Sequence, residues 1–417
     1  MDDGKWYWFD LTWDDTPEWE LGIVYNYFCV NDTQNVNWDN SQGMLEKKTF
    51  GSQHKAGQST NSNPAHKLTL PSRSGSEFTT KNVQKIKARF KVDGINYAVS
   101  GYNTVQLLGG NKTGVYKIPE TVKYISRTYT VTSLGNSSDP TMGYYEACFN
   151  QSSDGVITKL VIPKTVKFIW DNALFGNIQA IEVDKSNPYF TSVDGVLFTK
   201  SMYTLIQYPY GKAKVSKYTI PDATRVIARG ALSSLYNGFG ELVIGKNVNG
   251  IGYCNWGYGY QDKAPTGPFG GNYVSGELAR VFCDYINKSF KITVASGNSM
   301  FVSEGGVIYN QWKDEGSGKM LRMVECLANT DVTTVVFADN TVRITDNAFC
   351  DYGKLISVTI CKGMEQIGTR VFLFTGKLKI KYNGTVSQWN KIDKSEDWAY
   401  SNNGAKISVQ CTDGTGN

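Results

Sequence analysis

Histidine is almost absent from this chain, which limits the chemistry it can perform. Both histidines, His54 and His66, lie in a polar stretch rich in Gly, Ser and Asn, and residues 67–417 contain none. A Ser-His-Asp or Cys-His catalytic arrangement and a histidine-ligated metal are therefore excluded from the main body of the chain. No Gly-rich loop follows a strand and opens a helix, so the sequence gives no support for a nucleotide site.

Paired carboxylates are the remaining option for catalysis, because two close carboxyl groups can hydrolyse a glycoside. The acidic residues here fall instead at positions typical of turns: Asp194 precedes Gly195, and Asp314-Glu315 lies in a polar stretch that predicts a hairpin loop. Asp171-Asn172 and Asp346-Asn347 recur at the same phase of a repeat, which indicates a structural turn. We therefore expect no enzymatic activity, no catalytic residue and no cofactor.

The cysteines show neither a CxxC pair nor zinc-finger spacing with histidine. Several occupy apolar positions of a repeated pattern, where a free thiol behaves as a small hydrophobic group. We expect that the cysteines are buried free thiols and that the chain has no metal site. Disulfides or metal binding are the alternative. The cysteines are Cys29, Cys148, Cys254, Cys283, Cys326, Cys350, Cys361 and Cys411.

Aromatic rings separated by glycines gather in residues 252–273, a stretch that interrupts the regular pattern of the chain. Aromatic side chains with small neighbours can stack on sugars or form a protein-binding hot spot. The alternative is a loop that packs on itself and covers a sheet edge. The candidate ligand-binding residues are Tyr253, Trp256, Tyr258, Tyr260, Phe269 and Tyr273.

A repeated unit must provide the framework for such a loop, and residues 160–175 show one copy of it. Leu160 and Ile162 alternate as in a short strand, and Pro163 stops strand pairing because it lacks an amide donor. Val166, Ile169 and Ala173 follow Ile162 by four, seven and eleven residues. This spacing predicts a strand followed by a tight, partly helical return with one side turned inward. Any further role would fall to the outward residues, which are Lys164, Lys167 and Trp170.

Six copies of the unit recur along the chain, beginning at strands that contain Ile118, Ile162, Ile220, Ile244, Phe337 and Ile360. In each copy an Ile follows seven residues after this apolar residue, and the clearest neighbouring copies are 23 or 24 residues apart. One such unit cannot bury its apolar face alone, so the copies must stack. The resulting core ladder is Ile169, Ile227, Ile251, Ile344 and Ile367.

Two interruptions resemble each other and predict β-hairpins set into the array. One covers residues 187–198 and is followed by Thr204–Pro209, and the other covers residues 298–309 and is followed by Leu321–Cys326. Near the start of the regular region, Asp93-Gly94 gives a further hairpin signal.

Several linked motifs in a fixed order resemble the BspA-type leucine-rich repeat proteins. They are the Ile-Pro-x-x-Val-x-x-Ile pattern with Ala-Phe beginning four residues on, the Ser192–Leu197 insert and Thr204–Pro209. The tail, with Gln388-Trp389 and Val409–Gly414, resembles the cap that ends such arrays. The resemblance covers about residues 85–417. It implies a leucine-rich-repeat solenoid, a β-rich fold with a parallel sheet and short return turns, inserted β-hairpins and a small N-terminal β unit.

Composition divides the chain into four expected parts. Residues 1–45 form an aromatic-rich β segment that could dock on a partner through Trp6, Trp8 and Trp13, and residues 46–84 form a polar linker or long loop. Residues 85–376 hold the repeats with their hairpin insertions. Residues 377–417 form the C-terminal cap.

The net charge of +5 is small for 417 residues, and no basic run interleaves with aromatics in the way that nucleic-acid binding requires. A solvated mixed surface is expected, with weak attraction to an acidic surface as the alternative. No stretch is apolar enough to span a membrane. The start of the sequence lacks the basic and apolar regions of a signal peptide, so we expect either a removed leader or display without such export.

These observations favour a non-enzymatic recognition or adhesion protein that binds a protein or glycan on a cell surface. The resemblance implies display on the extracellular face of gut or oral bacteria, or on the virion of a phage that infects them. Residues 1–80 would then contact virion or surface-assembly subunits. The alternative is a structural virion or assembly protein whose array contacts neighbouring subunits, without an external ligand.

Overall fold

The computed structural model describes residues 8–9, 28–30, 35–39, 45–49, 89–101, 103–125, 127–135, 148–149, 155–170, 173–174, 176–232, 239–253, 291–373, 375, 378–400 and 407–416. For the described residues up to residue 49, and for residues 239 and 253, the structure describes the backbone alone. At the N-terminus, β1 (Trp8–Phe9) pairs with β2 (Phe28–Val30), and β3 (Asn35–Asp39) pairs with β4 (Leu45–Thr49). The expected N-terminal strands are present, and β4 continues past the boundary at residue 45.

Each repeat contributes two strands rather than one. In the unit at residues 160–175, β11 ends at Ile162 and Pro163 follows it directly, as the sequence predicts. The chain then turns, and the return that we expected to be partly helical begins instead with a second strand, β12 (Phe168–Ile169). The second strand forms because β10 (Arg127–Leu134) of the preceding repeat lies beside it and accepts the backbone hydrogen bonds of Lys167 and Trp170.

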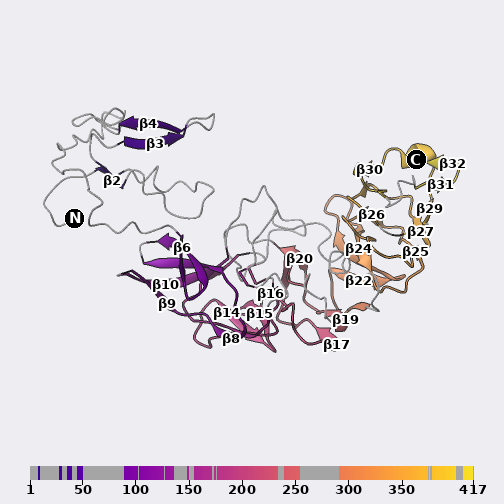
Figure 1. The fold of residues 1–417 in the computed structure, drawn as a ribbon. Helices are drawn as coiled ribbons and strands as arrows, with labels where there is room; N and C mark the ends of the chain where they lie inside the picture. Colours follow the sequence, from indigo (N-terminus) through magenta and orange to yellow (C-terminus); the bar gives the residue numbers. More distant parts are fainter. Residues whose placement is uncertain are drawn as a thin grey trace.

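Two parallel ladders therefore run through the repeats, as Figure 1 shows. First strands pair with first strands and second strands with second strands, each ladder being divided into three sheets. The first ladder consists of β8 (Gly114–Lys117), β11 (Ile157–Ile162), β13 (Ile181–Val183), β17 (Val215–Thr219), β19 (Phe239–Ile244), β21 (Lys291–Val294), β25 (Thr334–Val336), β27 (Ser357–Ile360), β29 (Lys379–Tyr382) and β31 (Val409–Cys411). The second ladder consists of β7 (Thr104–Gly109), β10 (Arg127–Leu134), β12, β16 (Thr204–Gln207), β18 (Val226–Ala228), β20 (Gly250–Tyr253), β24 (Met320–Leu327), β26 (Thr341–Ile344), β28 (Gln366–Ile367) and β30 (Asp393–Lys394).

Every sheet of the second ladder starts with an antiparallel three-stranded meander. The meanders are β5 (Arg89–Val92) with β6 (Ile95–Gly101) and β7, β14 (Phe190–Val193) with β15 (Val196–Thr199) and β16, and β22 (Phe301–Glu304) with β23 (Val307–Lys313) and β24. Both predicted hairpins are confirmed, but they begin sheets rather than interrupt them. The third strand of each meander is also the first strand of the parallel part of its sheet. The array therefore consists of three modules, each a meander followed by the repeats stacked on it, and the meanders begin at Arg89, Phe190 and Phe301.

The first turn of each meander has the same backbone geometry. Both central residues have positive φ: 48° and 80° at Asp93-Gly94, 50° and 77° at Asp194-Gly195, and 58° and 80° at Gly305-Gly306. This is the pattern of a type I′ turn, whose twist matches that of the flanking strands and which favours Asp-Gly or Gly-Gly. Asp194 is therefore a turn residue, as the sequence indicates.

Two apolar cores meet at the sheet that marks the first module boundary. One buried cluster extends from Phe90 to Ile206 and a second from Val196 to Cys411. The two overlap in β15 and β16, where Leu197 and Ile206 belong to the first cluster and Phe198 and Leu205 to the second. Because side chains alternate across a strand, this one sheet supplies an apolar face to each of two modules.

The predicted core ladder is largely confirmed. Ile169, Ile227, Ile344 and Ile367 are buried, and Ile251 is partly buried against the same core. The +7 residue of the first copy was expected to match them, but Ile125 is 42% exposed and has φ of 57°. Here β9 (Thr121–Tyr124) forms an antiparallel pair with β10, and Leu134 of β10 stands opposite Ile169 in the ladder.

The C-terminal segment closes the first ladder, as expected of a cap. β29 and β31 extend it in parallel, and β32 (Gly414–Gly416) then pairs antiparallel with β31. Between them, the short helix α4 (Val386–Trp389) starts at a capping box formed by Thr385 and Gln388. Its last residue, Trp389, is fully buried, so the cap completes the core at this end of the array.

Asn187 and Asn298 connect each later meander to the repeat before it. The Asn187 amide donates to the carbonyl oxygens of Pro163 and Val166 at 2.9 and 3.0 Å, and its oxygen accepts from the amides of Tyr189 and Phe190 at 2.8 and 2.9 Å. Asn298 makes four equivalent bonds to Gly245, Val248, Met300 and Phe301. A single side chain thus satisfies four backbone groups at each boundary.

We expect Asn187→Ala to lower the free energy of unfolding by about 2–4 kcal/mol, because it leaves buried backbone groups without partners. Urea denaturation followed by circular dichroism measures the effect. Asn96→Ala, at an exposed position of β6, is the matched control and should change the free energy by less than about 0.5 kcal/mol. Equal stability of the two variants would contradict the proposed role of Asn187.

Candidate binding surface

Most of the ligand-binding residues predicted from sequence lie outside the described residues. Trp256, Tyr258, Tyr260, Phe269 and Tyr273 belong to this group, as do Trp6 and Trp13 of the expected docking segment. Tyr253 ends β20 and Trp8 begins β1, and the structure describes only their backbone. The aromatic loop and the docking segment therefore stay predictions.

The outward residues of the repeat at 160–175 behave in two ways. Lys164 and Lys167 are exposed, and Lys164 pairs with Glu120 at 3.4 Å. Trp170 was expected to point outward, but it is only partly exposed, and its indole nitrogen is enclosed. Its ring packs edge-on against Phe168 with centroids 4.8 Å apart, so Trp170 contributes to packing rather than to an open surface.

The first ladder has one buried and one outward face. In β27 and β29 every second residue is buried, which leaves Ser357, Thr359, Lys379 and Lys381 turned outward. The same alternation appears in β13 and β31. Strand pairing puts these outward residues in rows across the sheet, so residues about 20 or more positions apart in sequence become neighbours roughly 4.8 Å apart.

The middle sheet of the first ladder has a row of alternating charge. Lys217 of β17, Glu241 of β19 and Lys291 of β21 stand in register. The Glu241 carboxylate accepts a hydrogen bond from the Thr293 hydroxyl at 2.7 Å and lies 3.6 Å from the Lys217 ammonium. The Thr293 hydrogen bond, together with the two lysines, lowers the pKa of Glu241 below its usual value, so this carboxylate stays charged at neutral pH.

The first sheet repeats this arrangement with one carboxylate. Glu182 of β13 is in register with Val161 and through it with Lys117, and it pairs with Lys159 at 2.8 Å. The hydrogen bond from Lys159 is the largest cause that lowers the pKa of Glu182. Exposed ion pairs of this kind contribute little to stability, so their main effect is on the charge that the face presents.

The third sheet has no carboxylate on its strands. One row consists of Thr334, Ser357 and Lys379, and the next of Val336, Thr359, Lys381 and Gln410. Val336 is 59% exposed, so this part of the face combines two ammonium groups, hydroxyls, an amide and an exposed apolar side chain. The sequence contains the signal for this surface, because Lys379 and Lys381 alternate with buried residues, but only the pairing shows which side chains accompany them.

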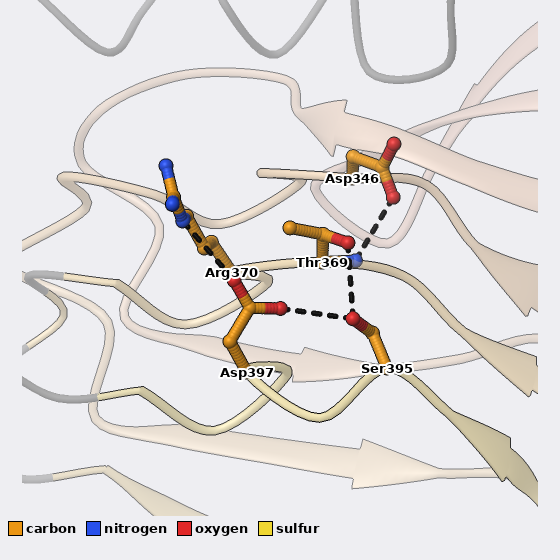
Figure 2. A network of polar contacts seen from close by, with 5 residues as sticks. All are labelled: Asp346, Thr369, Arg370, Ser395 and Asp397. Atoms are coloured by element: carbon orange, nitrogen blue, oxygen red, sulfur yellow. Dashed lines mark hydrogen bonds and ion pairs between the residues drawn. The ribbon is translucent and has the colours of Figure 1, made fainter.

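A polar network joins the turns that follow the second ladder in the last three repeats (Figure 2). The Thr369 amide donates to Asp346 Oδ1 at 2.9 Å, and the Thr369 and Ser395 hydroxyls lie 3.0 Å apart. Ser395 donates to Asp397 Oδ1 at 2.9 Å, and Arg370 Nε donates to Asp397 Oδ2 at 3.1 Å. Because Ser395 uses its one proton on Asp397, Thr369 must donate to Ser395.

Three of the four links connect one repeat to the next, and the Ser395–Asp397 bond lies within one turn. Aromatic rings stack in the core of the same repeats. The Phe349 and Phe372 centroids are 5.5 Å apart with planes 17° from parallel, and Trp398 meets Phe372 edge-on at 6.1 Å. The network therefore holds successive turns in register. Asp346 has the structural role that its repeat phase predicts, and Asp314 has a similar one, accepting two hydrogen bonds from Ser317 in the β23–β24 loop.

Removing the Asp397 carboxylate by Asp397→Ala should lower the free energy of unfolding by about 1–2 kcal/mol, because Ser395 and Arg370 both lose their acceptor. The difference should shrink in 1 M salt, since the Arg370–Asp397 pair is partly exposed. Glu396→Ala, one residue away and exposed, is the control. A stability of Asp397→Ala equal to that of the control would show that the network does not stabilise the repeats.

A buried carboxyl group stands in the third meander. Glu325 is 7% exposed and lies at a bulge in β24, where the pairing passes from Ile308–Cys326 to Tyr309–Val324. The equivalent bulge residues of the first two meanders are Leu108 and Ile206. Burial raises the pKa of the Glu325 carboxyl to about 7, and a hydrogen bond to Asn310 offsets part of the rise.

Glu325 should make the stability of the protein depend on pH. Between its ordinary pKa of 4.5 and about 7 the folded protein keeps a proton that the unfolded chain releases, so the free energy of unfolding falls as pH rises. A shift of this size corresponds to about 3 kcal/mol. Glu325→Gln should remove this part of the pH dependence in urea denaturation at pH 5 and pH 8, whereas Glu396→Gln should follow the wild type. An unchanged pH dependence in Glu325→Gln would contradict the assignment.

Comparison with known proteins identifies the repeat. Residues 323–404 match the family model described as the BspA type leucine rich repeat region, with six copies. The chain contains BspA-type leucine-rich repeats. The two-strand repeat continues upstream of the matched residues, because both ladders begin in the first module. No curated protein matches the chain in sequence.

Solved structures with some similarity are also leucine-rich or bacterial antigen proteins. The pneumococcal vaccine antigen PcpA is 13% identical, with 72% of this chain and 90% of that chain covered and a TM-score of 0.29. A leucine rich cell surface protein of Faecalibacterium prausnitzii is 14% identical (73% and 97%, TM-score 0.28), and a leucine-rich repeat protein of Bacteroides ovatus is 16% identical (70% and 70%, TM-score 0.29). TM-scores this low carry no argument, so the assignment rests on the family match and the repeat geometry.

Three further findings concern the described residues. Cys148, Cys326, Cys350, Cys361 and Cys411 are buried thiols that form no disulfide, in line with the expectation for these five. No group of three or more His, Cys, Asp or Glu side chains in the described part of the chain is placed to hold a metal ion. Within the same residues, no helix has the length and apolar character needed to cross a membrane.

Proposed function

We propose that this chain is a non-enzymatic recognition or adhesion protein that binds a macromolecule on a cell surface. The observation that carries the proposal is the outward face of the first ladder, a sheet surface built on stacked BspA-type repeats. Such a surface is extended and is supported from below by two adjoining apolar cores. It therefore suits large or repetitive targets better than a small substrate that must be enclosed.

The aromatic loop at residues 252–273 is proposed as a second part of the binding surface. It follows β20, the last strand of the second-ladder sheet in the middle module, and precedes β21 of the first ladder. Aromatic side chains there would add stacking or hot-spot contacts with the target. Residues 1–80, with Trp6, Trp8 and Trp13, are proposed to attach the protein to its carrier.

The proposed place of display is the outer surface of a bacterium, gut or oral bacteria being the first candidates. Immunogold labelling of producing cells would test this directly. Label on particles released by a phage, with none on the cell envelope, would instead place the protein on a virion.

Binding of the fluorescently labelled full chain to intact epithelial cells and to intact bacteria tests the function. Trp256→Ala/Tyr258→Ala should weaken binding at least tenfold if the loop contacts the target. Tyr400→Ala removes an aromatic ring that is 60% exposed elsewhere and serves as the control. Attachment unchanged by the double variant would reject the loop as a site. Absence of any cell binding by the wild type, together with self-assembly or assembly with other surface proteins, would reject adhesion itself.

A further inference from the structure

The positive charge of the chain is concentrated on the first ladder. Its strands carry six lysines and two glutamates, a net charge of +4, compared with +5 for all 417 residues. All six lysines are exposed. They are Lys117, Lys159, Lys217, Lys291, Lys379 and Lys381. Overall composition predicts a surface on which charges of both signs are mixed. The structure shows that they are unevenly distributed, because the outward face of the first ladder is basic.

Both glutamates of this face are already paired with lysines, Glu182 with Lys159 and Glu241 with Lys217. Lys117, Lys291, Lys379 and Lys381 form no ion pair with a described carboxylate. Lys217 and Lys291 stand two strands apart, roughly 10 Å, and Lys379 and Lys381 stand two residues apart on one strand, roughly 7 Å. Each of the three sheets of this face thus presents at least one exposed ammonium group that forms no ion pair with a described carboxylate.

Groups that can bond to an anion surround the unpaired lysines of the third sheet. Ser357 is in register with Lys379, and Thr359 and Gln410 flank Lys381 on either side. The five strands of this sheet have no acidic residue that would repel an anion. Hydroxyl and amide donors beside ammonium groups suit carboxylate, sulfate or phosphate oxygens, which accept charge-assisted hydrogen bonds.

The composition of the face also limits the class of polyanion. Single-stranded nucleic acids are bound by stacking bases on exposed aromatic rings. The tyrosines on these strands are engaged elsewhere: Tyr116 packs on Phe149, Tyr218 on Tyr208, and Tyr382 is buried beside Trp389. The basic residues are lysines alone, which act as point charges, whereas arginine is the usual choice for two-pronged recognition of phosphate. A linear acidic sugar chain needs only a row of such charges.

We propose that the outward face of the first ladder binds a linear anionic polysaccharide that carries carboxylate or sulfate groups. This inference rests on the proposed recognition function and specifies the class of its ligand. The sugar chain lies across the strands, along the rows of outward residues. Its anionic groups contact the unpaired lysines, and the neighbouring hydroxyl and amide groups donate to its oxygens.

Binding of the full chain to heparin, measured by biolayer interferometry in 50 mM NaCl, tests the proposal. Lys379→Gln/Lys381→Gln should weaken binding at least tenfold and reduce its dependence on salt concentration. Lys313→Gln/Lys319→Gln removes the same charge from the exposed β23–β24 hairpin and is the matched control. Neutral dextran and single-stranded DNA of comparable charge are the other probes, and both should bind at least tenfold more weakly than heparin.

Equal weakening by the two lysine pairs would overturn the proposal, because the effect would then follow net charge and not this face. Binding of DNA as strong as that of heparin would also overturn it. No heparin binding by a wild-type protein that still attaches to cells would reject the polysaccharide and leave the proposed function standing. Loss of cell attachment after protease treatment of the cells, with no effect of removing their acidic glycans, would favour a protein target instead.

Discussion

The structure depends on one constraint: a repeat of this length cannot bury its own apolar face. Each repeat offers two short strands, and both find their hydrogen-bond partners only in the repeats before and after. The buried isoleucines at the second strand and the buried residues of the first strand then pack together in two apolar clusters that adjoin at β15 and β16. Burial of each such side chain contributes about 1.5–3 kcal/mol, so the stack is the source of stability and the single repeat is not.

Continuity at the module boundaries has a different origin. A meander replaces the simple repeat there, and a type I′ turn, a bulge and an asparagine that bonds four backbone groups recur in the later modules at matching places. Asn187 and Asn298 satisfy backbone groups that the change from parallel to antiparallel pairing would otherwise leave alone. The bulge position is apolar in two modules and holds Glu325 in the third, so the third module departs from an otherwise consistent pattern.

Stacking leaves half of the first-ladder positions free of any role in the core, and these positions define the surface on which the proposed function rests. Neither Lys379 nor Lys381 supports folding through a buried contact, and the rows that contain them gather residues from separate repeats. By contrast, the hydroxyls and carboxylates of the Asp346–Asp397 network are used to connect turns. Polar residues of the array thus divide into those that hold repeats together and those that face outward.

The sequence by itself determined the features that depend on nearby residues: the repeat spacing, the stop at Pro163, the Asp-Gly turns, the meander hairpins and the cap. These follow from local propensity and from apolar spacing, which a single copy already contains. The tertiary structure alone decided the second ladder, the exposure of Ile125, the burial of Glu325 and the basic face. Each of these arises from pairing between strands that are distant in the chain, and no local pattern specifies which rows the paired side chains will form. The aromatic loop therefore stays a prediction from local sequence, whereas the basic face follows from the pairing of distant strands.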